Sequence, residues 1–510
     1  MQKRKIAALL IAGALSALVF SACNPSQPEV NARGAVMLCA QETQYTLTSG
    51  QSVEIPLDKD IEDKNYFFMN LQTNVNLVGH IHYENNGQHE KTNTEKFFIE
   101  AGSEEFTCFL DAFRLGARGI FDKIVTKITL QNVSTKAGNV LLESAGVTDR
   151  TYDRNQEIYI QDGHLKMGTS LGMGGALRHI EKLNANVVEY IDSAGHVRIE
   201  PNIDKEKVEL ITDEVNFVNI HDLGREIQQS YYSAVGEENG YAPTEPVLYD
   251  ADLRYNPVQA GSAGGMQSQI IDFHYTETEI YVKVRPLEWF FLNVLSDSYM
   301  ENIYTLKDDG TLRVVNRFVN FSQFTDMKKT EVYTQELPAV YIAQPLNYFY
   351  CETTEGVIFD PNLSPLPTTP GKTSLSHNVG SNYHYSLVQD QVVNDWVAFV
   401  NENKFGIGIY VPNAGIYSAS RGCTTTEYSM FDNQSYDKKY HNLYGREYIP
   451  SAYVTNYNYL SPASVLIMQD FVPLEYEYVI CIGTTEEMGA AFKRIAKNEK
   501  IFNHGLDAWK

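Results

Sequence analysis

Apolar and polar residues alternate in short runs along much of the chain, a period of two that is typical of β-strands with one buried face. Residues 278–285 are the clearest case, because Ile280, Val282 and Val284 share one face of the expected strand. An Asp-Gly pair at 309–310 separates two more such runs and predicts a β-hairpin. These patterns predict a chain made mostly of antiparallel strands.

One segment near the C-terminus has helical spacing instead. Thr484 and Glu487 are three residues apart, as in a capping box, and they precede an apolar stripe. The stripe recurs at intervals of three and four residues and consists of Met488, Ala491, Phe492 and Ile495. We therefore expect a helix that begins near Thr484 and buries one face.

The strand patterns divide the chain into two units. Residues 45–149 contain short strands and turns in the number expected for a β-sandwich, and residues 123–147 resemble the closing strands of jelly-roll carbohydrate-binding modules. Residues 150–510 are too long for a simple sandwich, which favours a large two-sheet supersandwich. We therefore predict an all-β protein: a jelly-roll accessory sandwich over 45–149, then a large β-supersandwich over 150–510 that carries the catalysis.

The first residues predict export from the cytoplasm. Lys3, Arg4 and Lys5 precede an apolar run that ends at Ser-Ala-Cys23, which resembles a bacterial lipobox. The expected product is a lipoprotein with signal peptide 1–22, a lipidated Cys23 carrying palmitate-type chains as membrane anchor, and a tether over 23–44. We expect it in the bacterial cell envelope, facing outside the cytoplasm; ordinary secretion with a buried Cys23 is the alternative.

Composition and charge exclude several kinds of partner. Hydrophobic residues make up 43% of the chain and charged residues 21%, which indicates a globular protein. The formal net charge of −23 argues against nucleic acid and against a basic patch on anionic lipid, so we expect membrane contact through the lipid only. The cysteines have no C-x-x-C spacing, and we predict no metal site and no cofactor, with structural Ca²⁺ left open.

The densest run of polar side chains covers residues 216–232. His221 can exchange a proton near neutral pH, Asp222 can act as a base, and Arg225 offers a two-pronged donor to hydroxyls or a carboxylate. Amide and aromatic groups in the same run suit sugar hydroxyls and ring faces: Asn219, Gln228, Gln229, Tyr231 and Tyr232. The alternative is a buried polar network that holds a long loop.

Other substrate-binding candidates are more scattered. Asn256 and Gln259 lie in a loop that contains a proline, and this loop could equally be a plain turn. Asp272 and His274 alternate along a strand, so they share a face, either towards a ligand or as a core pair. Trp396 could be a platform for a sugar ring or a core residue.

Glu336 is the candidate general acid. It enters an apolar strand shortly before Pro338, and burial there would raise its pKa, as a general acid requires. The alternative is a carboxylate at a strand end that accepts hydrogen bonds from backbone amides. We expect Asp222 and Glu336 to form the catalytic carboxylate pair, with His221 beside them.

Four motifs in order carry a family resemblance: Leu-Lys-Met-Gly…Gly-Gly-Ala-Leu (165–177), His-Asp-Leu-Gly-Arg-Glu-Ile-Gln-Gln (221–229), Gln-Glu-Leu-Pro-Ala (335–339) and Phe-Gly-Ile-Gly-Ile-Tyr (405–410). This order resembles large secreted β-sandwich proteins of bacterial polysaccharide-degrading systems. The Gly-Gly-Ala start also resembles galactose-mutarotase-like supersandwich proteins. The resemblance implies an architecture and a carbohydrate substrate, without a mechanism.

Three functions remain open from the sequence. The leading one is an extracytoplasmic lipoprotein that hydrolyses glycosidic bonds of a polysaccharide or oligosaccharide by a carboxylate pair. The second is a polysaccharide lyase, in which Asn219, His221, Arg225 and a tyrosine would neutralise a uronate and remove its α-proton. The third is a surface glycan-binding protein without catalysis.

Overall fold

The structure is a computed structural model of the 510-residue chain. It describes residues 35–39, 41–60, 64–85, 93–110, 123–219, 226–233, 255–262, 266–291, 294–324, 333–343, 345–360, 383–412, 414–423, 456–499 and 501. The predicted signal peptide, the lipidation site Cys23 and most of the tether lie outside these residues. So do His221, Asp222 and Arg225.

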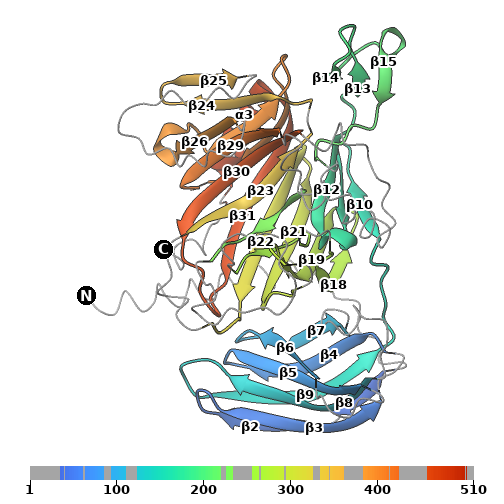
Figure 1. Ribbon diagram of the computed structural model, residues 1–510, viewed down its shortest axis with the longest axis vertical. Coiled ribbons are helices and arrows are strands. Elements are labelled where there is room, and N and C mark those ends of the chain that lie inside the picture. Colours follow the sequence, from blue (N-terminus) through green and yellow to red (C-terminus); the bar gives the residue numbers. More distant parts are fainter. Residues whose placement is uncertain are drawn as a thin grey trace, which may run out of the picture.

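The N-terminal part forms a small sandwich of two antiparallel sheets, drawn in blue to cyan in Figure 1. One sheet has the order β1-β9-β4-β7, with β2 also paired to β9, and the other has the order β3-β8-β5-β6. The aromatic rings of Phe67, Phe97 and Phe106 pack between them. The strands are β1 Val36–Cys39, β2 Thr43–Leu47, β3 Ser52–Asp60, β4 Tyr66–Thr73, β5 Leu77–Asn85, β6 Asn93–Ile99, β7 Glu105–Phe109, β8 Lys123–Asn132 and β9 Gly138–Thr148.

The rest of the chain forms a larger sandwich, which lies above the small one in Figure 1. A ten-stranded sheet runs β10-β11-β12-β16-β23-β30-β29-β26, with β17 and β20 attached at β16. Its strands are β10 Glu157–Gln161, β11 Leu165–Ser170, β12 Ala176–Lys182, β16 Ile227–Ser230, β17 Pro257–Val258, β20 Leu287–Glu288, β23 Tyr333–Ile342, β26 Tyr383–Val388, β29 Ile416–Cys423 and β30 Asn456–Leu466.

A nine-stranded sheet, of order β18-β19-β21-β22-β31-β28-β27-β24-β25, faces it. Its strands are β18 Gln269–Tyr275, β19 Glu279–Arg285, β21 Ser298–Lys307, β22 Thr311–Asn320, β24 Tyr348–Thr353, β25 Gly356–Asp360, β27 Trp396–Val400, β28 Phe405–Tyr410 and β31 Leu474–Thr484. Alternate residues of both sheets meet in one continuous apolar core. The fold is therefore all-β and of the sandwich type, as predicted.

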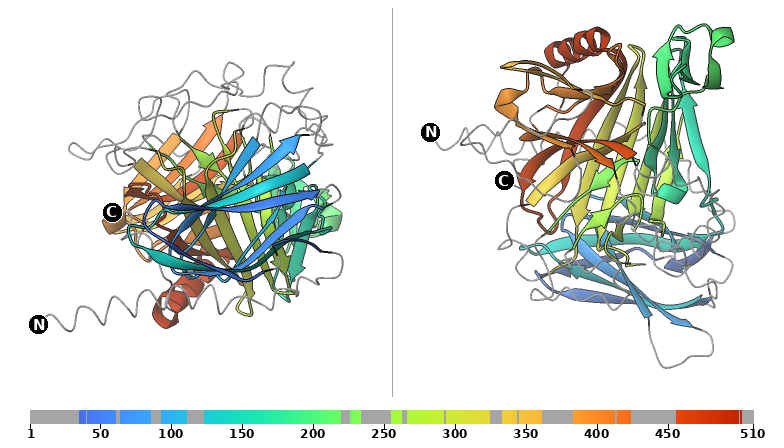
Figure 2. Two further views of the ribbon diagram at one scale, coloured as in Figure 1. Left: turned by 90° about the horizontal axis from the view of Figure 1, so that it is seen from below. Right: turned by 45° about the horizontal axis from the view of Figure 1, so that its top comes forward.

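Smaller elements complete the large sandwich. A three-stranded sheet of β13 Val187–Ile191, β14 Val197–Pro201 and β15 Glu209–Thr212 projects at the upper end in Figures 1 and 2. Short 3-10 turns occupy Leu171–Met173, Lys205–Lys207 and Gln389–Gln391. The predicted strand at 278–285 is confirmed as β19. The predicted hairpin is confirmed as the β21–β22 pair, in which Gly310 adopts a left-handed φ of 79°.

Helix α3 (Thr485–Asn498) confirms the predicted helix. Thr484 and Glu487 form the capping box: the Thr484 hydroxyl accepts from the Glu487 amide, and the Glu487 carboxylate accepts from the Thr484 amide. The apolar stripe of α3 packs on the outer face of the nine-stranded sheet, over β28 and β31. In the described part of the chain, no helix is long and apolar enough to cross a membrane.

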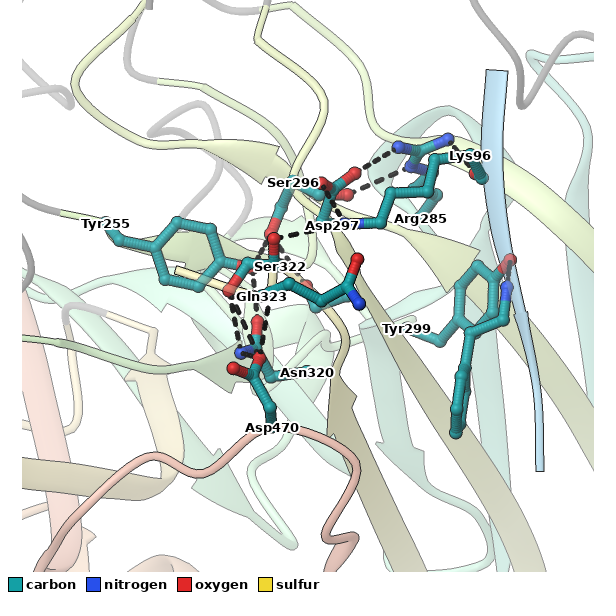
Figure 3. Close-up of polar contacts among 12 residues, drawn as sticks. Lys96, Tyr255, Arg285, Ser296, Asp297, Tyr299, Asn320, Ser322, Gln323 and Asp470 are labelled. Carbon is teal, nitrogen blue, oxygen red and sulfur yellow. Dashed lines mark hydrogen bonds and ion pairs between the residues drawn. The ribbon is translucent and has the colours of Figure 1, made fainter. Parts of the chain in front are cut away.

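The two sandwiches share a buried junction. Ile271, Tyr299, Val319 and Phe321 of the large sandwich belong to the same apolar cluster as the core of the small one. The Lys96 ammonium of the small sandwich bridges to the Asp297 carboxylate at 3.1 Å, and Arg285 binds the same carboxylate at 2.7 Å (Figure 3). The small sandwich is therefore packed firmly against the large one.

Candidate functional site

Strand β16 and the two residues that follow it carry the second half of the polar run, and their side chains alternate between two environments. Ile227, Gln229 and Tyr231 point into the core between the two large sheets, whereas Ser230 and Tyr232 point to the opposite, outer face of the ten-stranded sheet. The polar side chains on the two faces therefore need separate explanations.

The inward side chains form a closed hydrogen-bond network. The Gln229 amide donates to the Glu301 carbonyl at 2.8 Å and to Asn302 Oδ1 at 3.0 Å, while its own oxygen accepts from the Tyr231 hydroxyl at 2.7 Å. Gln259 accepts from the backbone amide of Gln229 at 3.0 Å and donates to the Gly174 carbonyl at 2.9 Å. The sequence predicts that Gln229, Tyr231 and Gln259 bind substrate. In the structure, their polar groups instead form hydrogen bonds inside the protein.

The outward side chains gather around Glu336 of β23. The Tyr232 hydroxyl donates to Glu336 Oε2 at 3.2 Å, and the Tyr459 hydroxyl of β30 donates to Glu336 Oε1. Ser230 donates to the Tyr232 hydroxyl at 3.3 Å. The carboxylate thus accepts one tyrosine hydroxyl on each oxygen, and we call Ser230, Tyr232, Glu336, Tyr341 and Tyr459 the outer-face cluster.

A change of register places Tyr341 in this cluster. Residues five apart on a regular strand lie on opposite faces, but the pairing of β23 with β30 shifts between Glu336 and Val340. Val340 and Ile342 enter the core, so Tyr341 faces outward, and its ring lies 4.5 Å from that of Tyr459. The irregularity therefore places a second aromatic ring, itself only 8% exposed, beside the carboxylate.

The electrostatics of the cluster keep Tyr232 protonated. Burial, reinforced by the charge of Glu336, raises the pKa of Tyr232 well above its ordinary value. A protonated phenol next to a carboxylate donates a hydrogen bond and can supply a proton, but it is a poor base at neutral pH. A phenol whose pKa is raised in this way is also a weak acid, so the arrangement suits the binding of hydroxyl groups.

The other predicted residues lie elsewhere. Asp272 accepts from the Tyr66 and Thr107 hydroxyls at 2.8 and 2.9 Å and pairs with Arg150 at 2.9 Å, so it joins the small sandwich to the large one. His274, half-buried on the same strand, stacks on Tyr281 at 4.7 Å.

Four more candidates are buried. Trp396 is 0% exposed and packs under α3, with its ring 5.5 Å from Phe492, which leaves no surface on which a sugar ring could stack. Asn256 and Asn219 are buried as well, and the backbone amide of Asn256 donates to Glu288 at 2.7 Å. Gln228 is also buried, and its oxygen accepts from the Ala260 amide at 3.0 Å.

Of the predicted site residues that the structure describes, Tyr232 and Glu336 are brought together. Asp222, the expected second carboxylate, lies outside the described residues, and so do His221 and Arg225. The sequence interpretation missed Tyr341 and Tyr459. Tyr459 was available from the pattern, because it alternates with the buried Asn458 and Leu460 along β30. Among the described residues, no three His, Cys, Asp or Glu side chains are grouped so as to hold a metal ion.

Comparisons with known proteins find similarity among solved structures. No protein-family model matches the chain, and no curated protein matches it. Among solved structures, the chain is similar to a protein in glycosyl hydrolase family 38 from Enterococcus faecalis, with a TM-score of 0.30 and 8% sequence identity. The similarity covers 90% of this chain and 47% of that protein, so the chain spans about half of its length.

Proposed function

We propose that this protein acts on a polysaccharide and that the outer-face cluster is part of its carbohydrate site. One observation carries the proposal: a half-buried carboxylate, Glu336, is held by the hydroxyls of Tyr232 and Tyr459 on an outer sheet face. Sugars present hydroxyl groups and apolar ring faces. The cluster supplies hydroxyls, a carboxylate and the paired rings of Tyr341 and Tyr459 as complements.

The reaction we propose is glycoside hydrolysis. Such reactions need a proton donor for the leaving oxygen and a second carboxylate as nucleophile or base. Glu336, or a tyrosine hydrogen-bonded to it, would be the donor. Asp222 is our choice for the second carboxylate, because it precedes β16 by five residues and Tyr232 follows the end of β16 by two.

Elimination is the second candidate function, because Tyr232 offers a protonated hydroxyl in the cluster. A lyase also needs a proton donor for the leaving oxygen, and the Tyr232 hydroxyl is our choice because it lies beside Glu336 and stays protonated. It needs in addition a base and a cation for the uronate, the functions we give to His221 and Arg225. Glycan binding without catalysis is the alternative to both enzyme functions.

The test is a Glu336→Gln variant assayed on a glycan panel. We expect the wild-type protein to release new reducing ends, and the variant to lose about 100-fold or more of that activity, as removal of an acid catalyst does. Glu279→Gln is the matched control, since Glu279 is a half-buried strand carboxylate on the other large sheet. Unsaturated, ultraviolet-absorbing products would indicate elimination. Binding without products would refute both enzyme functions.

We also propose that the mature protein is lipid-anchored at Cys23 and faces outside the cytoplasm. The support is the order of charged, apolar and small residues that precedes this cysteine. This location would place the protein where extracellular glycans are accessible.

A further inference from the structure

A second group of aromatic and polar side chains lies at the edge of the ten-stranded sheet, on the strands β10, β11 and β12. Tyr159 of β10 is 46% exposed, although it is a large aromatic residue in a well-formed strand. Its neighbours Ile158 and Ile160 enter the core, so Tyr159 lies on the outer face. This is the same face that carries the outer-face cluster.

The Tyr159 ring lies flat across the neighbouring strand. A Cβ atom placed on Gly168, its direct cross-strand partner, would lie 2.5 Å from the ring, so only glycine allows this position. The Tyr159 hydroxyl donates to Glu157 at 2.5 Å, which fixes the far end of the ring. One ring face is thus held against the backbone while the side chain stays about half exposed.

Hydrogen-bonding groups surround the ring. The Lys166 ammonium lies over the ring, 5.5 Å from its centre, and the His179 imidazole is steeply inclined to it, at 77° and with 5.5 Å between the ring centres. His179 Nε2 lies 3.4 Å from the buried Glu181 carboxylate, and Arg178 lies 3.5 Å from Glu157. A fixed aromatic surface with donors and acceptors at its rim matches a sugar ring, whose C–H face is apolar and whose edge carries hydroxyls.

We infer that Tyr159 is the platform of a second sugar-binding subsite, which engages a distant unit of the same polymer; this rests on the proposed function. Four strand intervals separate β10 from β23 in the sheet order, which at about 4.8 Å each is roughly 19 Å. A polymer of several sugar units can reach from Glu336 to Tyr159, whereas a mono- or disaccharide cannot. The subsite therefore selects for chain length.

The experiment compares Tyr159→Ala with Tyr275→Ala. Tyr275 is a matched control, because it is a strand tyrosine 51% exposed on the other large sheet. We expect Tyr159→Ala to weaken affinity for the polymer about fivefold to tenfold and to leave cleavage of a short oligosaccharide unchanged. Tyr159→Phe, which keeps the ring and loses the bond to Glu157, should retain most of the affinity.

Hydroxyl-radical footprinting of the wild-type protein gives a second reading that does not depend on a variant folding. The polymer should protect Tyr159 and not Tyr275, and a disaccharide should protect neither. If the polymer binds and Tyr159 is neither protected nor needed for affinity, the subsite is refuted while the proposed function stands. If the wild-type protein neither binds nor cleaves any glycan, the proposed function fails, and the subsite fails with it.

Discussion

Replacing Arg317 with methionine should destabilise the protein strongly, because Arg317 is the centre of a buried charge ladder. Lys283, Glu301, Arg317 and Glu475 are direct cross-strand neighbours on β19, β21, β22 and β31, so their charges alternate in sign across the nine-stranded sheet. The Arg317 guanidinium lies 3.0 Å from Glu301 and 2.8 Å from Glu475. It also binds Glu100 of the small sandwich.

The magnitude follows from the two carboxylates left behind. Burial opposes ionisation of Glu301, but Lys283 and Arg317 outweigh it and hold the pKa of Glu301 below its ordinary value. Burial raises the pKa of Glu475 even with Arg317 in place. Removing the guanidinium from such a buried group costs about 3–5 kcal/mol. At roughly 2 °C per kcal/mol for a unit of this size, the Tm should fall by about 6–10 °C.

The assay is thermal unfolding of three variants. Arg317→Met keeps the aliphatic volume and removes the charge, and a triple variant adds Glu301→Gln and Glu475→Gln. The triple variant should recover much of the lost stability, because it removes the two buried carboxylates that Arg317 neutralises and leaves only the more exposed Lys283 and Glu100 without these partners. Arg198→Met, at an ion pair on the projecting three-stranded sheet, is the control and should have a much smaller effect. A Tm within about 2 °C of wild type for Arg317→Met, or no recovery in the triple variant, would refute the reasoning.

Three further predictions follow from the junction, the buried histidine and the N-terminus. Deleting residues 35–148 should leave the large sandwich insoluble rather than independently active, because it would expose Tyr299, Val319 and Phe321; a soluble, monodisperse product in size-exclusion chromatography would contradict this. Burial, and then the charge of Lys166, lower the pKa of His179 to about 4 from its ordinary value of 6.5. As the pH falls, the unfolded chain therefore binds this proton before the folded protein does, and stability is lost between about pH 6.5 and 4. His179→Gln should flatten the dependence of Tm on pH in that window. Cys23→Ser should abolish metabolic labelling with palmitate and shift the protein from the membrane fraction to the soluble fraction, and unchanged labelling would refute Cys23 as the lipidation site.

The local patterns of the sequence were sufficient for elements, but not for the contacts between them. Alternation in residues 278–285, the Asp-Gly turn at 309–310 and the capping box at Thr484 each depend on neighbouring residues, and each is found in the structure. Which face of a strand meets the core depends on the partner sheet. The adjacent residues Gln229 and Ser230 are both polar, yet one enters the core and the other faces outward.

The candidate site was predictable only in part for the same reason. A carboxylate in an otherwise apolar strand singled out Glu336, because this anomaly is visible in the sequence alone. The register shift that turns Tyr341 to the same face has no such local signal, since it depends on how β23 pairs with β30. Asp272 shows the opposite case. Its chemistry resembles that of a site residue, but its partners Tyr66 and Thr107 are about 165 to 206 residues away in the chain and make it part of the junction.

The distribution of structural contacts explains why the proposed site lies on the ten-stranded sheet. A two-sheet sandwich has two outer faces. On the nine-stranded sheet, α3 packs over β28 and β31, while the small sandwich packs against Tyr299, Arg317 and Asp272. Binding a polymer there would require giving up buried apolar area and ion pairs. On the ten-stranded sheet, Glu336 and Tyr159 are held by hydrogen bonds yet keep accessible surface, so a ligand can bind without disturbing the core. Within the described part of the chain, Ser230 and Tyr341 beside Glu336 are only 4% and 8% exposed, so a ligand would reach this face through the partly accessible side chains of Glu336 and Tyr159.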